Sequence, residues 1–234
     1  LLFGSNGIVA SNINLPSYEI VLLRLLLGSL FLITVFTVSR QRFTFYRNKH
    51  TCLYLFISAS AMGASWMLLY EAYQQVGISI ASLAYYCGPV IVMILSPFLF
   101  RETLTWPKIA GFLTVLAGMC LVNLQALDEG KTIWGLFCGL MSAFMYALMV
   151  TANKKAKPES GLENSLLQLV IGSFIVVAFV SMQKNFVLSL TTIDWIPVLL
   201  LGLLNTGIGC YLYFSSITDL SLIHISEPTR LRCI

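Results

Sequence analysis

The residues of this sequence that could do chemistry are the few ionisable side chains that lie within its long apolar runs. Arg24 lies about four residues from the middle of one such run. A charge inside a bilayer is costly, so the residues that carry one often line the pathway of a solute or an ion. Two roles have equal weight for Arg24: binding of an anionic group of a substrate, and a structural ion pair or bond to helix-end carbonyls.

Two carboxylates, Glu19 and Glu71, lie near the ends of apolar runs. Glu19 is five residues from Arg24, which places the two side chains roughly 140° apart around a helix, so they cannot pair on one face. A carboxylate at the end of a helix can reach interfacial water, which favours a structural role for both. A buried carboxylate could instead carry a coupling proton.

Aromatic side chains with a polar atom recur at helical spacing. Such residues suit the wall of a cavity, because each has an apolar body and a hydrogen-bonding group. Packing within a bundle and an interfacial belt are the alternatives. We predict that Trp66, Tyr70 and Tyr85 contact a substrate, and that Tyr73, at the end of its run, belongs to the belt.

Two amides and one proline complete the candidate site. Asn6 and Asn205 lie at or near the middle of apolar runs, where either a substrate contact or an interhelical hydrogen bond is expected. Pro89 lies near the centre of a run and leaves the carbonyl of Tyr85 without its helical partner. Broken helices of this kind often line the sites of transporters.

The elements that position these residues follow from composition. The chain has 234 residues, of which 58% are hydrophobic and 10% charged, and its mean hydropathy is +0.85. Soluble domains carry about 25% charged residues, so a soluble enzyme, a DNA-binding domain and a disordered chain are excluded. We expect an all-α polytopic membrane protein with the lipid bilayer as its surroundings. About 20 apolar residues cross a bilayer, which predicts full spans over 17–39, 51–71, 78–100, 107–124, 132–151, 164–182 and 195–217, after a half-span over 1–10.

Orientation follows from the basic residues of the loops, which gather on the cytoplasmic side. One set of alternate loops holds nine lysines and arginines and the other holds only Lys131 and Lys184. The basic loops 40–50, 101–108 and 153–163, and the N-terminus, are therefore predicted to be cytoplasmic. The nine residues are Arg40, Arg42, Arg47, Lys49, Arg101, Lys108, Lys154, Lys155 and Lys157.

Other motifs give little support to catalysis or cofactor binding. The six cysteines have no metal-ligand spacing, the two histidines are isolated, and no phosphate-binding loop is present. No cofactor, metal, catalytic residue or nucleic-acid partner is expected. Small residues at four-residue spacing, such as Gly135 and Gly139, predict close helix packing within the chain, and a homodimer is the alternative.

A repeat relates the two halves. Glu19, Arg24, Gly28 and Ser29 have counterparts 144 residues later in Glu163, Gln168, Gly172 and Ser173, and Tyr70 has a weaker one in Tyr213. The charge rule gives the two segments opposite orientations, as in inverted-topology repeats. We predict two repeat units of the five-helix type: residues 1–124, with the first span truncated, and residues 132–219, with only the sixth to eighth spans. An intact protein would have ten spans, so we expect this chain to be cut short at both ends.

The last fifteen residues depart from this pattern. Residues 220–230 resemble the translation of a DNA sequencing adaptor. We therefore expect 220–234 to be non-native and assign no function to its residues.

The chain resembles an EamA-type member of the drug/metabolite transporter superfamily. The resemblance implies two five-helix halves around a central cavity and export or import of small metabolites. A secondary transporter of amino acids or related compounds, in the plasma membrane and with export favoured, is the expected function; a membrane scaffold or receptor is the alternative, and a membrane-embedded enzyme a weaker one. The resemblance is carried by Phe3–Asn6, Glu19 with Arg24, Tyr86–Val90, Phe100–Trp106, Gly111 and Gly118.

Overall fold

The computed structural model describes most of the chain as helices. The described residues are 13, 15–41, 43–100, 133–158, 160–181 and 195–219, with isolated positions at 9, 106, 109–111, 113, 114 and 117. No β-strand occurs among them. Five helical stretches in this part of the chain are long and apolar enough to cross a membrane, as expected for a polytopic membrane protein. The half-span 1–10 (apart from residue 9), most of span 107–124 and the tail 220–234 lie outside the described residues.

Helix α2, Ser17–Val38, carries Arg24 in a fully buried stretch. It begins directly after Pro16, whose fixed backbone angle suits the start of a helix. Residues 19–25 are buried on every side, so Arg24 sits in the interior and not on a lipid-facing surface. Further along the helix the outer face becomes exposed, as at Leu30.

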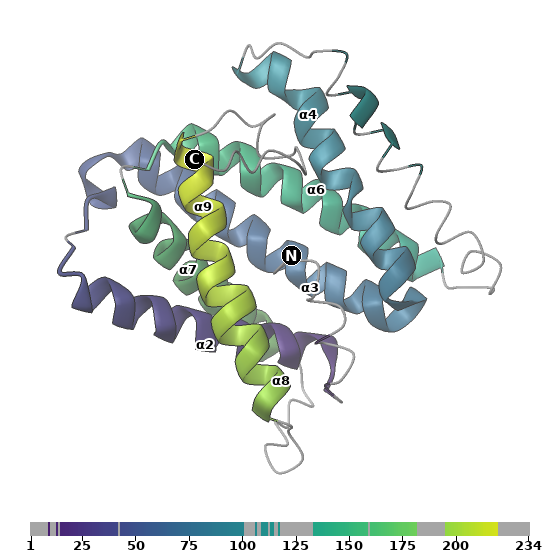
Figure 1. The fold of residues 1–234 in the computed structure, drawn as a ribbon, viewed down its shortest axis with the longest axis horizontal. Coiled ribbons are helices and arrows are strands. Elements are labelled where there is room, and N and C mark those ends of the chain that lie inside the picture. Colours follow the sequence, from purple (N-terminus) through teal and green to yellow (C-terminus); the bar gives the residue numbers. More distant parts are fainter. Residues whose placement is uncertain are drawn as a thin grey trace.

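Helices α3, Lys49–Tyr85, and α4, Cys87–Phe100, form a helical stretch of 52 residues that is too long for one span. At 1.5 Å per residue it would measure about 78 Å, against a hydrocarbon core of about 30 Å. Gly77 interrupts it with φ 82° and ψ 163°, and a turn at Tyr86 separates α3 from α4. Figure 1 shows the chain turning back on itself between the first part of α3 and α4. The predicted span 78–100 is therefore made of the last turns of α3 and all of α4.

The second half contributes three spans. Helix α6, Ile133–Ala156, is followed after a short connection by α7, Gly161–Ser181. Reciprocal hydrogen bonds of 2.9 and 3.0 Å join the side-chain amides of Asn153 and Asn164 across this connection. The last span consists of α8, Trp195–Leu199, the π-helix η5, Leu200–Ile208, and α9, Gly209–Asp219.

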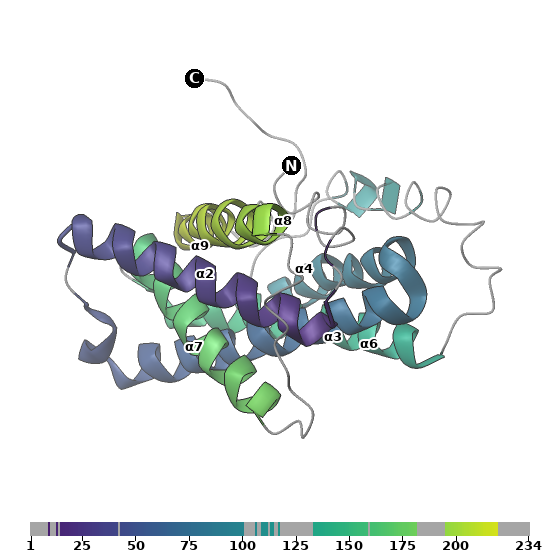
Figure 2. The same ribbon diagram turned by 90° about the horizontal axis from the view of Figure 1, so that it is seen from below.

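Helices of the two halves pack against one another. Helix α3 packs mainly on α6 and α7, while α2 packs on α7 and η5. In Figure 2, α2 lies between α7 and the span formed by α8 and α9. Ser65 and Ser142 each donate a hydroxyl hydrogen bond to the other's carbonyl, at 2.9 and 2.7 Å, which joins α3 to α6.

The glycines of α6 are used for packing within this chain. A Cβ on Gly139 would lie 2.8 Å from the Cβ of Ala84, and one on Gly135 would lie 2.7 Å from the Cβ of Gln75. Such distances are shorter than real contacts allow, so α6 approaches α3 this closely only with glycine at both positions.

Candidate functional site

The largest group of predicted site residues meets at one internal cavity. It has a volume of about 220 Å³, and its wall draws on α2, α3, α4, α6 and α9. Arg24, Trp66, Tyr70, Tyr85 and Pro89 all line it; their role in substrate binding stays a prediction. The other lining residues are Met62, Leu69, Tyr73, Ile78, Ser82, Tyr86, Tyr146, Met149, Cys210, Tyr213 and Phe214.

Arg24 is held in this wall by uncharged partners. Its Nε donates to Thr206 Oγ1 at 3.0 Å and its Nη1 donates to Tyr70 Oη at 2.7 Å. The guanidinium carbon lies 4.0 Å from the centre of a Trp66 ring, a cation–π contact. The side chain is 2% exposed, and its Nη2 atom is buried with no hydrogen-bond partner among the described residues.

This arrangement positions the positive charge without neutralising it. Hydroxyl groups and an indole ring stabilise a cation less than a carboxylate does, and a buried charge without a counter-ion is unfavourable. A ligand with an anionic group would supply the missing counter-charge and a hydrogen-bond acceptor for Nη2. The cavity wall is therefore suited to an anion.

Tyrosines from the three helices α3, α6 and α9 form much of the wall. The rings of Tyr85 and Tyr146 meet edge-to-face at 5.4 Å, and the hydroxyls of Tyr146 and Tyr213 are 2.8 Å apart. The rings of Tyr70 and Tyr73 are 5.3 Å apart. Such rings offer apolar faces to the body of a small solute and hydroxyl groups to its polar atoms.

The π-helix η5 places Thr206 beside Arg24. The Thr206 hydroxyl donates to the carbonyl of Leu201, five residues back, at 2.8 Å, and accepts from Arg24. Gly28 permits the close approach, since a Cβ there would lie 2.8 Å from Thr206 Cγ2 and 3.2 Å from Gly202 O. π-Helical segments are rare and are frequent at functional sites.

The break predicted at Pro89 lies three residues earlier in the structure. The helix turns at Tyr86, and Pro89 occupies the first turn of α4, where a missing backbone N–H is tolerated. The break brings Tyr85, Tyr86 and Pro89 to the cavity together.

Two further predicted positions differ from the rest. Asn205 is buried and is not among the residues that line this cavity, and its neighbour Thr206 contacts Arg24; a role for Asn205 in substrate binding or in an interhelical hydrogen bond stays a prediction. Tyr73, predicted from the sequence to belong to an interfacial belt, lines the cavity. Asn6 lies outside the described residues.

The two carboxylates differ from each other. Glu19 is 4% exposed, so the prediction that it reaches interfacial water is wrong; the start of α2 is buried all round, and its Oε2 atom has no hydrogen-bond partner. Glu71 is partly exposed and accepts a hydrogen bond of 3.0 Å from Gln75 Nε2. A coupling role for either stays a prediction.

Sequence reasoning missed Thr206, Tyr146 and Tyr213. Tyr213 had a signal, because it is the repeat counterpart of Tyr70. Tyr146 and Thr206 had none within their own helices, since contacts between distant spans bring Tyr146 to the cavity and Thr206 to Arg24.

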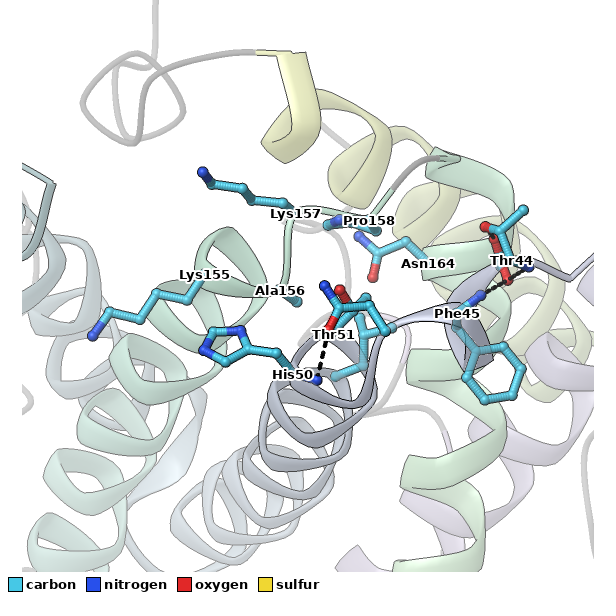
Figure 3. A pocket seen from close by; sticks show the side chains of 12 residues that line it. Thr44, Phe45, His50, Thr51, Lys155, Ala156, Lys157, Pro158 and Asn164 are labelled. Atoms are coloured by element: carbon cyan, nitrogen blue, oxygen red, sulfur yellow. Dashed lines mark hydrogen bonds between the residues drawn. The ribbon is translucent and has the colours of Figure 1, made fainter.

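A further carboxylate, Glu163 in the first turn of α7, contacts the segment before α3 at the end of the bundle that carries the basic loops. Its Oε1 accepts from the backbone N–H groups of Thr44 and Phe45 at 2.6 and 2.9 Å, and its Oε2 accepts from the Thr44 hydroxyl. Figure 3 shows Thr44 and Phe45 on the segment that precedes α3. Nearby, Ser160 donates to Gln41 Oε1 at 3.0 Å.

Comparisons with known proteins agree with a membrane transporter. The sequence model of the EamA-like transporter family matches residues 1–124 and 133–226. A Bacillus subtilis (strain 168) protein described as "Uncharacterized transporter YxxF" is 28% identical over 233 residues, which are 97% of this chain and 73% of that protein. An Acidianus ambivalens protein described as "Uncharacterized transporter in sor 3'region" is 27% identical over 130 residues, 56% of this chain and 50% of that protein. One crystal structure matches 96% of this chain and 78% of its own with a TM-score of 0.75; its 16% identity indicates a shared fold alone.

Proposed function

The chain belongs to the EamA-like transporter family, and from this premise we propose that it is a secondary transporter of small polar metabolites that carry an anionic group. Amino acids and related carboxylates are the favoured class, and export across the plasma membrane is the favoured direction. The cavity around Arg24 is the substrate site of this proposal.

One observation carries the proposal: a buried arginine at the cavity wall has neutral partners and one unpaired nitrogen. A substrate carboxylate would accept from Nη2 in a charge-assisted hydrogen bond, which is stronger than a bond between neutral groups. The tyrosine rings around the cavity would pack on the remainder of the solute.

Contacts between α2 and α7 support an inverted repeat. A Cβ on Gly28 would lie 3.2 Å from Leu169 Cδ1, and a Cβ on Gly172 would lie 3.8 Å from Leu25 Cδ2. An offset of 144 residues exchanges Leu25 with Leu169 and Gly28 with Gly172. Each contact is thus the counterpart of the other, as a two-fold axis between α2 and α7 requires.

The same exchange extends to the next pair of spans. Gly28 lies against the carbonyl of Gly202 at 3.2 Å, while Gly172 lies against the carbonyl of Ala59 at 3.5 Å. Ala59 and Gly202 are 143 residues apart, the offset found for Tyr70 and Tyr213. These pairs support two units, within 1–124 and 132–219, that rock against each other in alternating access.

In this proposal the Glu163 contact closes the cytoplasmic end of the cavity. Glu163 belongs to the second unit, whereas Thr44 and Phe45 belong to the first, so their hydrogen bonds must break before the units can separate there. Glu19 is the repeat counterpart of Glu163 at the opposite end. Its buried, unpartnered oxygen is consistent with a carboxylate that gains a partner, or a proton, in the other conformation.

Flux measurements in proteoliposomes test the proposal. The full chain would be assayed with radiolabelled amino acids and with the amines that remain when their carboxylate is removed. We expect uptake of the carboxylates, none of the amines, and loss of uptake in Arg24→Gln. Leu30→Ala, on the exposed face of the same helix, serves as the control and should transport normally.

Two outcomes would contradict this function. Equal uptake of amines and amino acids would remove the role given to Arg24. Absence of flux for every carboxylate, with correctly folded protein in the membrane, would remove the transport proposal for this chain.

A further inference from the structure

A second cavity lies at the end of the bundle that carries the basic loops. It has a volume of about 290 Å³ and is enclosed by the segment before α3, the first turns of α3, the end of α6 and the start of α7 (Figure 3). It shares no lining residue with the cavity around Arg24. The proposed transport mechanism uses only the hydrogen bonds between Glu163 and Thr44–Phe45 at one side of this cavity and makes no use of its lysines.

The side chains around this second cavity carry an excess of positive charge. His50, Lys155 and Lys157 line it, and Figure 3 shows their side chains extending toward the same side. Of the neighbouring lysines, Lys154 is engaged, since its Nζ donates to the carbonyl of Ile217 at 3.2 Å. No such bond is found for Lys155 or Lys157 within the described part of the chain.

The single carboxylate of the lining, Glu163, offsets one of the two lysine charges, so the lining keeps a net positive charge. Both oxygens of Glu163 accept hydrogen bonds from Thr44 and Phe45, and no ion pair joins it to either lysine among the described residues. The ammonium groups of Lys155 and Lys157 and the hydroxyl of Thr51 are therefore the donors that this lining offers to a ligand.

The cavity lies where three candidate membrane spans begin or end, which is the level at which a bilayer is expected to meet water. Helix α3 begins beside it at Lys49, α6 ends at Ala156 and α7 begins at Gly161. Aromatic rings gather at the same level, as at membrane interfaces: Phe36 stacks on Phe43 at 4.5 Å, and His50 lies 4.6 Å from Tyr54.

An apolar surface continues from this level into the membrane. Leu53 and Phe56, one turn into α3, are 57% and 53% exposed. A molecule with its anionic group among the lysines could extend an acyl chain along this face of the helix.

We propose that the second cavity binds a phosphate group, carried by the headgroup of an anionic lipid or by a small soluble phosphate ester. Lysine ammonium groups bind phosphate as point charges, and a hydroxyl donor adds direction. The proposed ligand is distinct from the transported solute, because this cavity shares no lining residue with the cavity around Arg24 and its binding test measures no flux.

Lipid and phosphate binding to the purified full chain tests this inference. Native mass spectrometry would measure retention of phosphatidylglycerol and of phosphatidylcholine, and a competition series would add inorganic phosphate. We expect preferential retention of phosphatidylglycerol. Lys155→Gln/Lys157→Gln should bind it about tenfold more weakly, the effect expected when two such contacts are lost.

The control must remove the same charge outside the cavity. Arg40→Gln/Lys49→Gln does so at the same end of the bundle, because both residues are exposed and neither lines the cavity. Its lipid binding should equal that of the unmodified protein. His50→Gln and Thr51→Val, each measured alone, test the same prediction of weaker phosphatidylglycerol binding through side chains other than the lysines.

Each outcome has a defined meaning. Competition by millimolar inorganic phosphate assigns the site to soluble phosphates as well, whereas resistance to competition assigns it to the lipid. Equal losses in the cavity variant and the control variant, or equal retention of the two lipids, would overturn the proposal.

Discussion

Two buried ionisable side chains, Arg24 on α2 and Glu163 on α7, are held in opposite ways. Both oxygens of Glu163 accept hydrogen bonds from the facing segment. Arg24 has only uncharged partners and keeps one nitrogen without any. The difference teaches that a hydrogen-bonded carboxylate joins two segments of the chain, α7 and the segment before α3, while a cation without a counter-ion beside a cavity can accept a ligand.

The largest expected effect is on transport, in which replacement of Arg24 should matter more than replacement of Glu163. Arg24→Met should lower carboxylate flux about 100-fold, since a hydrogen bond to a charged group contributes about 1.5–3 kcal/mol. Thermal unfolding should be unchanged or shifted upward, because an apolar residue replaces a buried charge without a counter-ion. A clear drop in the unfolding temperature, measured in detergent, would instead make Arg24 a structural residue.

Glu163→Ala should show the reverse pattern, with stability as the main loss. The backbone N–H groups of Thr44 and Phe45 would lose their acceptor, at a cost of about 2–3 kcal/mol in the free energy of unfolding. Glu163→Gln keeps an acceptor oxygen and should lose less than half of this. Denaturant unfolding of both variants distinguishes loss of an acceptor from loss of charge.

The repeat-related glycines sharpen the comparison between the units. Gly28→Ala should destabilise by about 1–3 kcal/mol, because the new methyl would press on Thr206 and a backbone carbonyl. Gly172→Ala should cost less, since its shortest contact, 3.1 Å, is to the flexible end of Met62. Only Gly28→Ala should also reduce flux, through displacement of Thr206 from Arg24. If both variants transport equally well, the packing role of Gly28 does not extend to substrate binding.

The smallest expected effect concerns the far side of the cavity. Tyr146→Phe removes the hydroxyl that is hydrogen-bonded to Tyr213, at about 1 kcal/mol of stability or substrate affinity. Substrate affinity measured by flux against concentration should fall less than tenfold. A loss as large as that of Arg24→Met would move the centre of the site toward Tyr146.

Much of this architecture could be predicted from local sequence. Runs of apolar residues place α2, α6, α7 and the last span, and the burial of Arg24 follows from its position within such a run. Hydropathy is a property of each segment alone, so it needs no knowledge of neighbours.

The rest depends on contacts between segments. Asn205 has the expected depth, but it is Thr206 that the π-helix turns toward Arg24. The sequence of residues 200–208 contains no pattern that predicts the wider turns of a π-helix. The partners of Glu163 lie in a segment 118–119 residues earlier, beyond any periodic signal. The full burial of Glu19 likewise reflects packing around the start of α2 and not its distance from the helix end.

The backbone conformation of Gly77 affects the shape of the cavity around Arg24. Its φ of 82° and ψ of 163° lie in a region that residues with a side chain do not occupy without strain. Every residue that follows, up to Tyr85 and Tyr86 at the cavity, takes its direction from this achiral joint. A substitution of Gly77 would therefore change the direction of the two aromatic rings, about eight residues later in the chain. The effect of such a substitution on transport would report on the shape of the cavity, although Gly77 itself does not line it.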